Sequence, residues 1–577
     1  MDADVRDLSP RTFRVSLLLV LAVAAILRGL YPVADPPWQT TVGIVWHDEG
    51  AWVHNARNKA LFGGWTQDAW NPMYIAPVFT ALEYVSFRAF GVGLWQARIV
   101  SEVLGCFSVL LLALGVARVA GRRAGVLAGA LLATNYVYVM WNRTAMMEGP
   151  MTAFLVASWY CYVRAESSPR WGWGAAVFAL LAFFTKAAAA FFVAAVGLDA
   201  LLRIAFATDR RNTATRGAGA TLLALVACGI AALLVFVAPN WADYQFYNWQ
   251  MSVTRKPSYD LKSLLYRITA FPVLHDLFTR MWFTLALATA SAFGVLARWR
   301  IASPGERLLG LWLALGTLEL ILHDVGNERR FIFFIPALVA LAAIALARDR
   351  CVVPADVSTL PRRTAWLAAP VLAYAAYVVL GAIIRIGFLY EIRPNVRIAT
   401  AAAVSFTALV LATWPKVPRW LASTRWTPRA AVVVALIVAG GQVVQYGQWA
   451  VARTSRNYDA SVQLGRVLPA GTLVHGKLAN GLSLENRIRP IFVGHGFGNF
   501  EDRKTRDDVR YILTYVAPRV GYEGSQILDV LDAYPHRTII MTFDVAETAT
   551  GDDRAALIDK FGAVPGEKRQ TAGRAKD

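Results

Sequence analysis

Residues 13–31 read FRVSLLLVLAVAAILRGLY, a long apolar run with few polar side chains inside it. An α-helix rises about 1.5 Å per residue, so about 20 such residues cross a hydrocarbon core about 30 Å thick. No small-residue cleavage site follows the run, so we expect it to be retained as a membrane helix. Further runs of this kind cover residues 95–117, 124–141, 150–165, 171–187, 188–206, 217–238, 282–298, 307–323, 331–347, 365–386, 397–414 and 430–449.

The composition agrees with a chain that crosses a membrane many times. Hydrophobic residues make up 56% of the 577 positions and charged residues 17%, against about 45–50% and 25% in soluble domains. Twenty Trp and twenty Tyr are typical of aromatic belts at two bilayer interfaces. The cysteines lie in or between apolar runs and give no disulfide framework or Cys-ligated metal site. We predict a mostly α-helical polytopic membrane protein with about 13 transmembrane helices.

The basic residues predict the orientation. The net charge is +19, but the Arg residues are dotted between apolar runs, which favours the positive-inside rule over nucleic-acid binding. Arg6 and Arg11 precede the first run and Arg14 lies at its start, so we expect a cytoplasmic N-terminus. With this orientation, the connections after the second, fourth, sixth, eighth, tenth and twelfth runs are cytoplasmic. Each of them is rich in basic residues, as the rule predicts: Arg118–Arg123, Arg164–Arg170, Arg203–Arg211, Arg298–Arg307, Arg348–Arg363 and Lys416–Arg429. An odd helix count places the C-terminus outside the inner (plasma) membrane.

Two long segments fall on the external side of this topology. Residues 32–94 form the first external loop, and residues 239–281 form a second one rich in Trp, Tyr and Asn. The run 73–90 within the first loop is interrupted by Glu83 and Arg88. We interpret it as an interfacial or re-entrant helix, because a further span would put the next Arg cluster outside.

The chain changes character at about residue 451. Residues 1–450 form the transmembrane domain, and residues 451–577 lose the long apolar runs and predict a soluble extracytoplasmic α/β domain. The glycine-rich segment 494–498 lacks the context of a dinucleotide-binding fingerprint. Strand-like segments occur at Leu473–Leu478, Pro490–Val493, Tyr511–Tyr515 and Thr538–Phe543, and a helix is expected near Arg554–Phe561.

Charged residues at membrane depth are costly, so each group of them suggests a function. In the first external loop, Asp48 and Glu49 open a predicted helix, and His47, His54 and Arg57 lie beside them in the sequence. A solvated, capped loop helix would explain the acids structurally. Paired acids followed by His and Arg, in a chain so poor in charge, favour a functional site. The spacing does not fit a zinc protease motif.

A second group of charges is expected on the same face. Glu148 lies between the third and fourth runs, and Lys186 lies at the external end of the fifth. His323, Arg329 and Arg330 follow the ninth run, where adjacent Arg residues are contrary to the positive-inside rule. This exception suggests an anionic ligand, and Arg forks suit phosphate well.

Together these residues predict one external face with carboxylates, cations and aromatics. Aromatics and carboxylates suit sugars, whereas Arg and Lys suit phosphate. An external transferase needs a sugar that is already carried on a lipid phosphate, because nucleotide sugars do not cross the membrane unaided. A transporter or flippase of a lipid-linked saccharide and a non-catalytic scaffold of envelope assembly are the alternatives. Metal dependence stays open, because Asp48, Glu148 and a nearby His could share a divalent cation or repel one another.

The residues also resemble a known family. The stretch Asp48-Glu49-Gly-Ala-Trp-Val-His-Asn-Ala-Arg-Asn, followed by Leu61-Phe-Gly-Gly-Trp65, resembles the first-loop motif of GT-C-fold glycosyltransferases. The similar members are the glycosyltransferase 39 group, namely protein O-mannosyltransferases and the aminoarabinose transferase of lipid A. Matches in the family's order are Phe90-Gly-Val, Ala97-Arg98, Gly121-Arg-Arg-Ala-Gly125, Met146-Met-Glu148-Gly-Pro150, Phe184-Thr-Lys186 and Glu328-Arg-Arg-Phe331.

This resemblance implies a periplasmic site, a polyprenyl-phosphate-linked sugar donor and inversion at the anomeric carbon. The family's motif Asp corresponds to Asp48, the candidate general base, with Glu49 completing the pair. Glu148 stands where the family usually has Asp, and Trp70-Asn71-Pro72 lacks the Lys that often precedes these prolines. Thirteen helices and an external C-terminal domain resemble the aminoarabinose transferase more than the mannosyltransferases. The acceptor could be a protein, lipid A, a glycan or another lipid.

Overall fold

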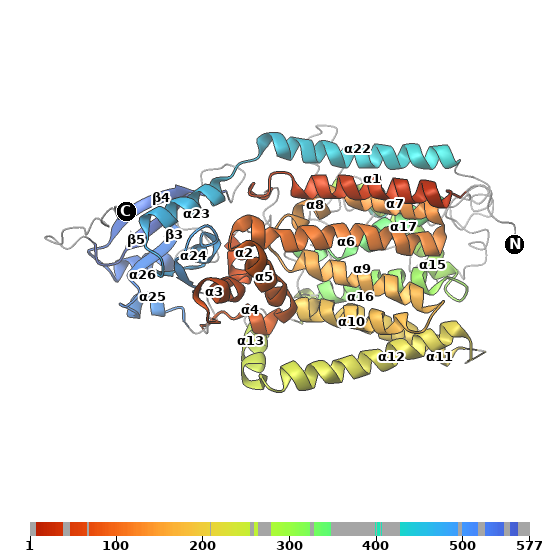
Figure 1. Ribbon diagram of the computed structural model, residues 1–577, viewed down its shortest axis with the longest axis horizontal. Coiled ribbons are helices and arrows are strands. Elements are labelled where there is room, and N and C mark those ends of the chain that lie inside the picture. The colour runs from red at the N-terminus through yellow and green to blue at the C-terminus, as the bar shows by residue number, and fades with distance from the viewer. Residues whose placement is uncertain are drawn as a thin grey trace.

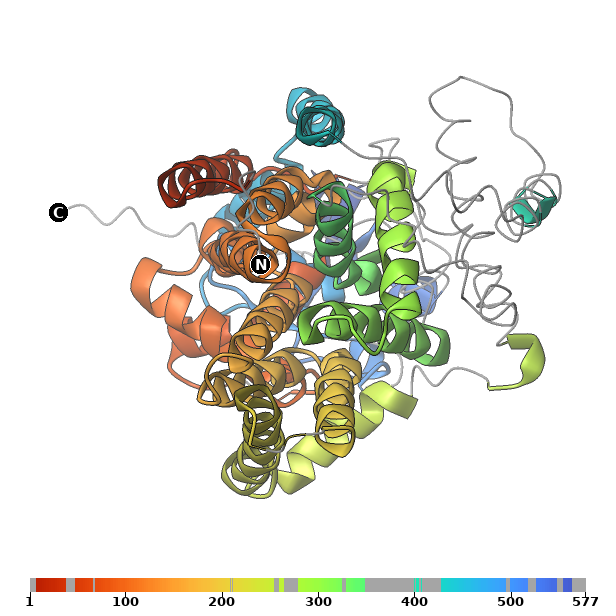
Figure 2. The same ribbon diagram turned by 90° about the vertical axis from the view of Figure 1, so that its right-hand side faces the viewer.

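The computed structural model describes a helical bundle with a sheet-containing region beyond one of its ends (Figure 1). Figure 2 looks along the bundle and shows most of its helices nearly end-on. The described residues are 7–562 apart from 38–46, 66–67, 208, 210, 254–258, 264–278, 324–327, 348–398, 400, 404–405, 407–426, 494–498, 517–525 and 547–553.

Helices occupy the apolar runs wherever these fall on described residues. The predicted run 365–386 lies outside the described residues, and so does most of 397–414. The bundle helices are α1 (Pro10–Gly29), α6 (Leu94–Ala120), α7 (Arg122–Thr134), α8 (Tyr136–Asn142), α9 (Glu148–Ala165), α10 (Trp171–Thr185), α11 (Ala190–Ala205), α12 (Thr213–Ala232), α15 (Trp282–Ala297), α16 (Pro304–His323), α17 (Phe334–Ala347) and α22 (Pro428–Ala452).

Among the described residues, five helical segments are long and apolar enough to cross a membrane. A sixth is formed by α7 and α8 if they count as one span, bent by 62°. The bend occurs at Asn135, which leaves the helical conformation and caps α8 by accepting a hydrogen bond from the Tyr138 N–H. Shorter apolar helices are α10, α15 and α17. The number of transmembrane helices, about 13, stays a prediction.

The helices of the first external loop lie across one end of the bundle (Figure 1). They are α2 (His47–Trp52), α3 (His54–Phe62), α4 (Pro72–Ile75) and α5 (Pro77–Phe90). Pro72 and Pro77 each stand at the first helical position, where the missing N–H has no cost. The run 73–90 is therefore helical, as expected, and its interfacial placement stays a prediction. Helix α13 (Trp241–Val253), in the second loop, packs against α4 through stacked Tyr74 and Tyr247 rings.

The C-terminal region forms a five-stranded mixed sheet in the order β2-β1-β3-β5-β4. Strand β1 pairs in parallel with β2 and β3, whereas β5 pairs antiparallel with β3 and β4. The four strands expected from the sequence are present. The elements are α23 (Arg456–Val467), β1 (Leu473–His475), α24 (Lys477–Gly481), β2 (Arg489–Ile491), α25 (Asp502–Thr505), β3 (Tyr511–Tyr515), α26 (Gln526–Asp532), β4 (Thr538–Asp544) and β5 (Arg554–Asp559).

The helix expected near Arg554–Phe561 was wrong, because these residues form strand β5. Its sequence, RAALID, has two Ala and no alternation, which favoured a helix. In the sheet, β5 lies between β3 and β4, and five of its six residues are buried. A strand covered on both faces needs no alternation of polar and apolar residues, so tertiary pairing overrides the local preference.

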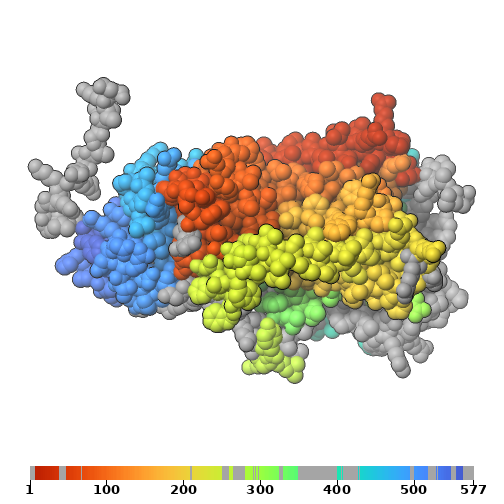
Figure 3. All heavy atoms as spheres, turned by 60° about the horizontal axis from the view of Figure 1, so that its bottom comes forward, coloured from red at the N-terminus to blue at the C-terminus, as the bar shows by residue number. Residues whose placement is uncertain are grey.

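The first external loop and the C-terminal region pack directly against each other. The Trp70 ring of the loop stacks on Phe492 at 5.1 Å between ring centroids. The Glu485 carboxylate accepts a hydrogen bond from the Leu94 N–H at the start of α6. The space-filling view shows the C-terminal atoms in blue against the loop in red and orange (Figure 3). Side chains from both segments can therefore contribute to one site.

Candidate active site

Asp48 is the centre of a buried cluster of charges. It lies on α2 and is 8% exposed. Its Oδ2 accepts a hydrogen bond from Arg329 Nη1 at 2.6 Å, and its Oδ1 lies 2.6 Å from Lys477 Nζ. Arg329 comes from the 3-10 turn η4 (Glu328–Phe331), and Lys477 is the first residue of α24. The cluster therefore joins the first loop, a connection between bundle helices and the C-terminal region.

The two cations dominate the electrostatics of this carboxylate. Burial alone would raise the pKa of Asp48, but the charges of Lys477 and Arg329 outweigh burial and hold that pKa well below its usual range. The His47 Nε2 atom lies 3.9 Å from Asp48 Oδ1. Burial and the Lys477 charge hold the pKa of His47 well below its usual range, so its ring is neutral at pH 7.

Glu148 extends the cluster toward the bundle. It is the first residue of α9, is fully buried, and accepts a hydrogen bond from Lys186 Nζ at 2.6 Å. Lys186 has an extended backbone between α10 and the 3-10 turn η1 (Ala187–Ala189), so a break in the helical run positions it. Arg329 Nε lies 3.6 Å from Glu148 Oε1. Arg329 therefore contacts both Asp48 and Glu148.

Among the described side chains of this cluster, cations outnumber carboxylates. Arg330 is half-buried and close enough to Lys186 for the two charges to repel each other. Two carboxylates, Asp48 and Glu148, thus face four cations: Lys186, Arg329, Arg330 and Lys477. Buried like charges are unfavourable unless a counter-charge approaches them. An arrangement of this kind suits an anionic ligand such as a phosphate group.

Glu49 lies next to Asp48 in sequence but has different partners. Its two carboxylate oxygens accept hydrogen bonds from Arg98 Nε and Nη2 at 2.8 and 2.7 Å, and Oε1 also accepts from the Ala145 N–H. Arg98 donates as well to the carbonyl oxygens of Pro32 and Ala34. This fork joins α2 to α6 and to the segment before α9. The geometry supports a positioning role for Glu49.

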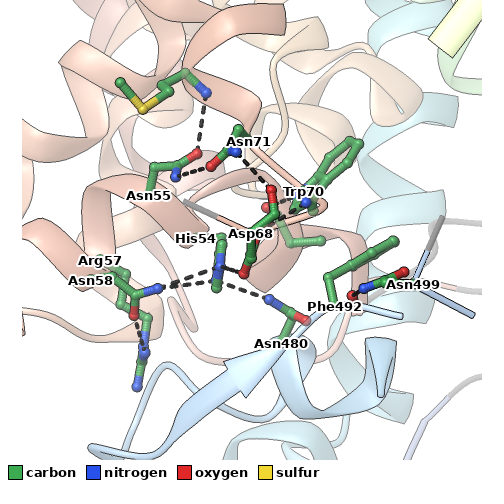
Figure 4. Close-up of polar contacts among 12 residues, drawn as sticks. His54, Asn55, Arg57, Asn58, Asp68, Trp70, Asn71, Asn480, Phe492 and Asn499 are labelled. Atoms are coloured by element: carbon green, nitrogen blue, oxygen red, sulfur yellow. Dashed lines mark hydrogen bonds and ion pairs between the residues drawn. The ribbon is translucent and has the colours of Figure 1, made fainter. Parts of the chain in front are cut away.

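His54 belongs to a separate polar network, which Figure 4 shows. Its Nε2 lies 2.9 Å from Asp68 Oδ2, and its Nδ1 lies 3.1 Å from the Asn480 side-chain nitrogen. Because an amide nitrogen can only donate, this contact assigns the proton of a neutral His54 ring to Nε2, facing Asp68. The network therefore ties α3 to α24, one turn beyond Lys477.

Arg57 is fully buried and holds the C-terminal region in place. Burial lowers its pKa to about 9. Its guanidinium donates to backbone carbonyl oxygens in the segment after α24, namely those of Ser483, Asn486 and Ile488. These partners support a structural role. His323, also predicted to bind substrate, ends α16 with an exposed ring near Glu319.

The structure thus brings together Asp48, His47, Glu148, Lys186, Arg329 and Arg330 from the sequence prediction. It gives Glu49, His54, Arg57 and His323 other partners. The sequence analysis missed Lys477, Arg98 and Asp68 as members of these networks. No local feature of the sequence marks Lys477, because its contact with Asp48 depends on how the C-terminal region packs on the first loop.

The fold is similar to that of proteins of known structure. ArnT from Cupriavidus metallidurans bound to undecaprenyl phosphate has a TM-score of 0.55 with this chain at 16% identity, covering 97% of this chain and 99% of ArnT. The chain has the GT-C fold. The apo state of the same ArnT has a TM-score of 0.52 at 16% identity and covers 95% and 97% of the two chains. The resemblance expected from the sequence motifs is confirmed at this level.

A family model points the same way. The model for dolichyl-phosphate-mannose-protein mannosyltransferase matches residues 74–241, which include Glu148 and Lys186 but not Asp48. The oligosaccharyltransferase of Archaeoglobus fulgidus tethered with an acceptor peptide has a TM-score of 0.45 with this chain at 13% identity, covering 88% of this chain and 69% of that one. No curated protein matches the sequence.

Proposed function

We propose that this GT-C chain is an inverting glycosyltransferase that moves a sugar from a polyprenyl-phosphate-linked donor to an acceptor on the extracytoplasmic face. The observation that carries the proposal is the buried Asp48 carboxylate between Arg329 and Lys477, with Glu148, Lys186 and Arg330 beside them. A carboxylate can take a proton, and the surplus of cations can hold a phosphate. The ArnT structure bound to undecaprenyl phosphate supports a lipid phosphate as the anion.

The proposed reaction is one displacement at the anomeric carbon. Asp48 removes the proton from the acceptor hydroxyl as its oxygen bonds to the anomeric carbon, which is general base catalysis. The bond from that carbon to the phosphate oxygen breaks at the same time. The electron pair leaves with the polyprenyl phosphate, and the configuration of the sugar inverts. Arg329, Lys477 and Lys186 stabilise the charge on the leaving phosphate.

Donor binding also changes the basicity of Asp48 in this proposal. A carboxylate that is paired with two cations is a weak base. Phosphate oxygens are competing acceptors for the same Arg329 and Lys477 N–H groups. A bound donor therefore draws these charges away from Asp48 and raises its basicity when the acceptor is about to react.

Metal chemistry is not required by this scheme. Within the described ranges, no three or more His, Cys, Asp or Glu side chains are arranged so that they could hold a metal ion. Both oxygens of Asp48 face cations, which is unfavourable for an added divalent ion. Whether a divalent cation contributes is tested by measuring transfer with and without a chelator.

The proposal is tested with the purified full-length chain in lipid vesicles. A polyprenyl phosphate carrying a radiolabelled sugar is supplied with acceptors of each class: protein, lipid A, glycan and lipid. We expect release of free polyprenyl phosphate and one labelled acceptor. Movement of the intact labelled donor across the bilayer, without cleavage of its phosphate bond, would instead identify a flippase.

The proposed orientation places the cluster outside the plasma membrane. In a background without native cysteines, Gly64→Cys in the first loop and Arg554→Cys on β5 are expected to react with a membrane-impermeant maleimide in intact cells. Arg211→Cys, between α11 and α12, is expected to react only after lysis. The reverse pattern contradicts the orientation.

A further inference from the structure

A cavity of about 310 Å³ lies between the first external loop and the edge of the C-terminal sheet. Its volume is at the lower end of ligand pockets, so it fits a small ligand or one part of a larger one. Neither Asp48 nor Lys477 lines it. The lining residues that carry the argument are Asn58, Phe62, Trp65 and Asp68 from the loop, and Arg489 and Arg506 from the C-terminal region.

Arg489 gives the cavity an available cation. It begins β2, the edge strand of the sheet, and its guanidinium lies over the Phe62 ring at 4.5 Å from the centroid. Within the described part of the chain, its side chain has no hydrogen bond or ion pair. Arg506, by contrast, is paired with Asp508. The contact with Phe62 uses the face of a ring and none of the guanidinium N–H donors, so these N–H groups can meet an anion.

Asp68 and Asn58 supply polar groups to the lining of the same cavity. Asp68 Oδ1 accepts a hydrogen bond from the Trp70 N–H at 2.9 Å, and its Oδ2 faces the buried His54 ring (Figure 4). The Asn58 amide also lies against His54, at 3.3 Å from Nδ1. The Asn58 amide oxygen accepts a hydrogen bond from Arg57 Nη1, so the carboxylate and the amide are both held in place by buried partners. Such groups suit the hydroxyls of a sugar.

Trp65 supplies an aromatic face at the same place. It is 37% exposed and contacts the tilted ring of Tyr84, at 5.4 Å between ring centroids, and the Lys59 ammonium, at 5.8 Å from the Trp65 ring centroid. An indole held in this way offers a flat apolar surface to a ligand. The cavity thus combines an aromatic face, hydroxyl-binding groups and one available cation.

We infer that this cavity binds an acidic saccharide, a sugar with a carboxylate or phosphate group, as part of the acceptor. The inference deepens the proposed function and rests on it. Helix α24 joins the two places, because Lys477 at its start pairs with Asp48 and Asn480 on the same helix contacts His54. An acceptor held against Arg489 extends past α24 to reach Asp48.

The test measures saccharide binding to the purified full-length chain by titration in saturation-transfer NMR. The probes are glucuronate, glucose 6-phosphate and uncharged glucose. We expect at least one acidic probe to bind tenfold or more tightly than glucose, and the preferred probe identifies the acidic group. Arg489→Ala should abolish this preference, Arg489→Lys should keep part of it, and Trp65→Ala should weaken all three probes. Arg554→Ala, which removes an exposed Arg three strands away, should change nothing.

Equal binding of all three probes, or wild-type preference in folded Arg489→Ala, overturns the inference. Thermal melting shows that each variant is folded. Binding of polyprenyl phosphate and sugar transfer are measured on the same samples to separate the two proposals. If the chain binds an acidic probe more tightly than glucose but transfers no sugar from the donor, the proposed function is contradicted and the assignment of the cavity is retained. If the chain transfers sugar but does not prefer an acidic probe, only the assignment of the cavity is overturned.

Discussion

Lys477 Nζ lies 2.6 Å from Asp48 Oδ1, although one residue begins a helix of the C-terminal region and the other lies in the first external loop. Both side chains are nearly buried. The ion pair shows that the C-terminal region contributes directly to the charge cluster.

The first prediction concerns this Lys. Lys477→Ala is expected to reduce use of the polyprenyl-phosphate donor tenfold or more, because one charge-assisted hydrogen bond to phosphate contributes about 1.5–3 kcal/mol. Loss of its charge also raises the pKa of Asp48, so the acid limb of the pH–rate profile should move to higher pH. Lys504→Ala, in the partly exposed pair with Glu501, is the control. An unchanged profile with wild-type turnover would contradict the assignment.

The second prediction separates Glu49 from its neighbour. Glu49→Gln leaves the buried Arg98 guanidinium without its carboxylate. Breaking one side of a buried ion pair costs about 3–5 kcal/mol, so we expect a marked drop in thermal stability. Asp544→Asn removes the carboxylate of the exposed Arg554 pair and should cost no more than about 1 kcal/mol. Normal stability with lost turnover would instead make Glu49 a catalytic group.

The sequence predicted the helices well because the signal for them is local. Long apolar runs and the prolines at 72 and 77 act within a few residues, and the structure has helices at these places. Strand β5 was missed because burial on both faces depends on β3 and β4. The sequence of Arg554–Asp559 does not indicate that β3 and β4 will pair with it.

The candidate site was predictable in part, for the same physical reason. Asp48, Glu148 and Arg329 stood out because charges are rare in this chain, and they do lie together. Lys477 did not stand out, because a Lys in a polar tail is ordinary until the tail packs on the loop. The different roles of Asp48 and Glu49 depend on the partners Arg329 and Arg98, which come from distant segments.

The third prediction compares the two adjacent arginines. Arg329 contacts both Asp48 and Glu148, whereas Arg330 is half-buried and lies near Lys186. Arg329→Ala should therefore reduce donor use tenfold or more, and Arg330→Ala should have a smaller effect. The readout is donor KM and turnover. Arg300→Ala, an exposed Arg between α15 and α16, is the matched control. Wild-type kinetics in both variants would make the pair an interfacial anchor.

The fourth prediction is a pH dependence of stability in the C-terminal region. Burial and the Lys560 charge lower the pKa of His475 to about 3, whereas an unfolded His titrates near pH 6.5. The unfolded chain therefore binds a proton below about pH 6.5 that the folded chain does not. Stability should fall with decreasing pH by at most about 1.4 kcal/mol per unit between pH 6 and 4.

The comparison of two variants isolates this effect. Burial lowers the pKa of Lys560 to about 8, so its side chain is charged in both states below pH 7 and adds no slope there. His475→Gln should flatten the pH dependence, whereas His536→Gln, at an exposed position, should retain it. Unfolding of the full chain is followed by denaturant titration at each pH. Equal slopes in both variants would show that His475 is not the titrating group.

The last prediction concerns Asp48 itself. Asp48→Asn keeps the shape of the side chain but cannot accept a proton, so transfer should fall by about a hundredfold or more. The variant also removes the anion that competes for Arg329 and Lys477, so binding of polyprenyl phosphate should be as tight as in the wild type or tighter. Thermal melting in the presence of that lipid controls for folding. Loss of turnover with retained lipid binding is the outcome expected of a general base. If Asp48→Asn keeps more than about a third of the activity, Glu148 becomes the leading candidate for the base.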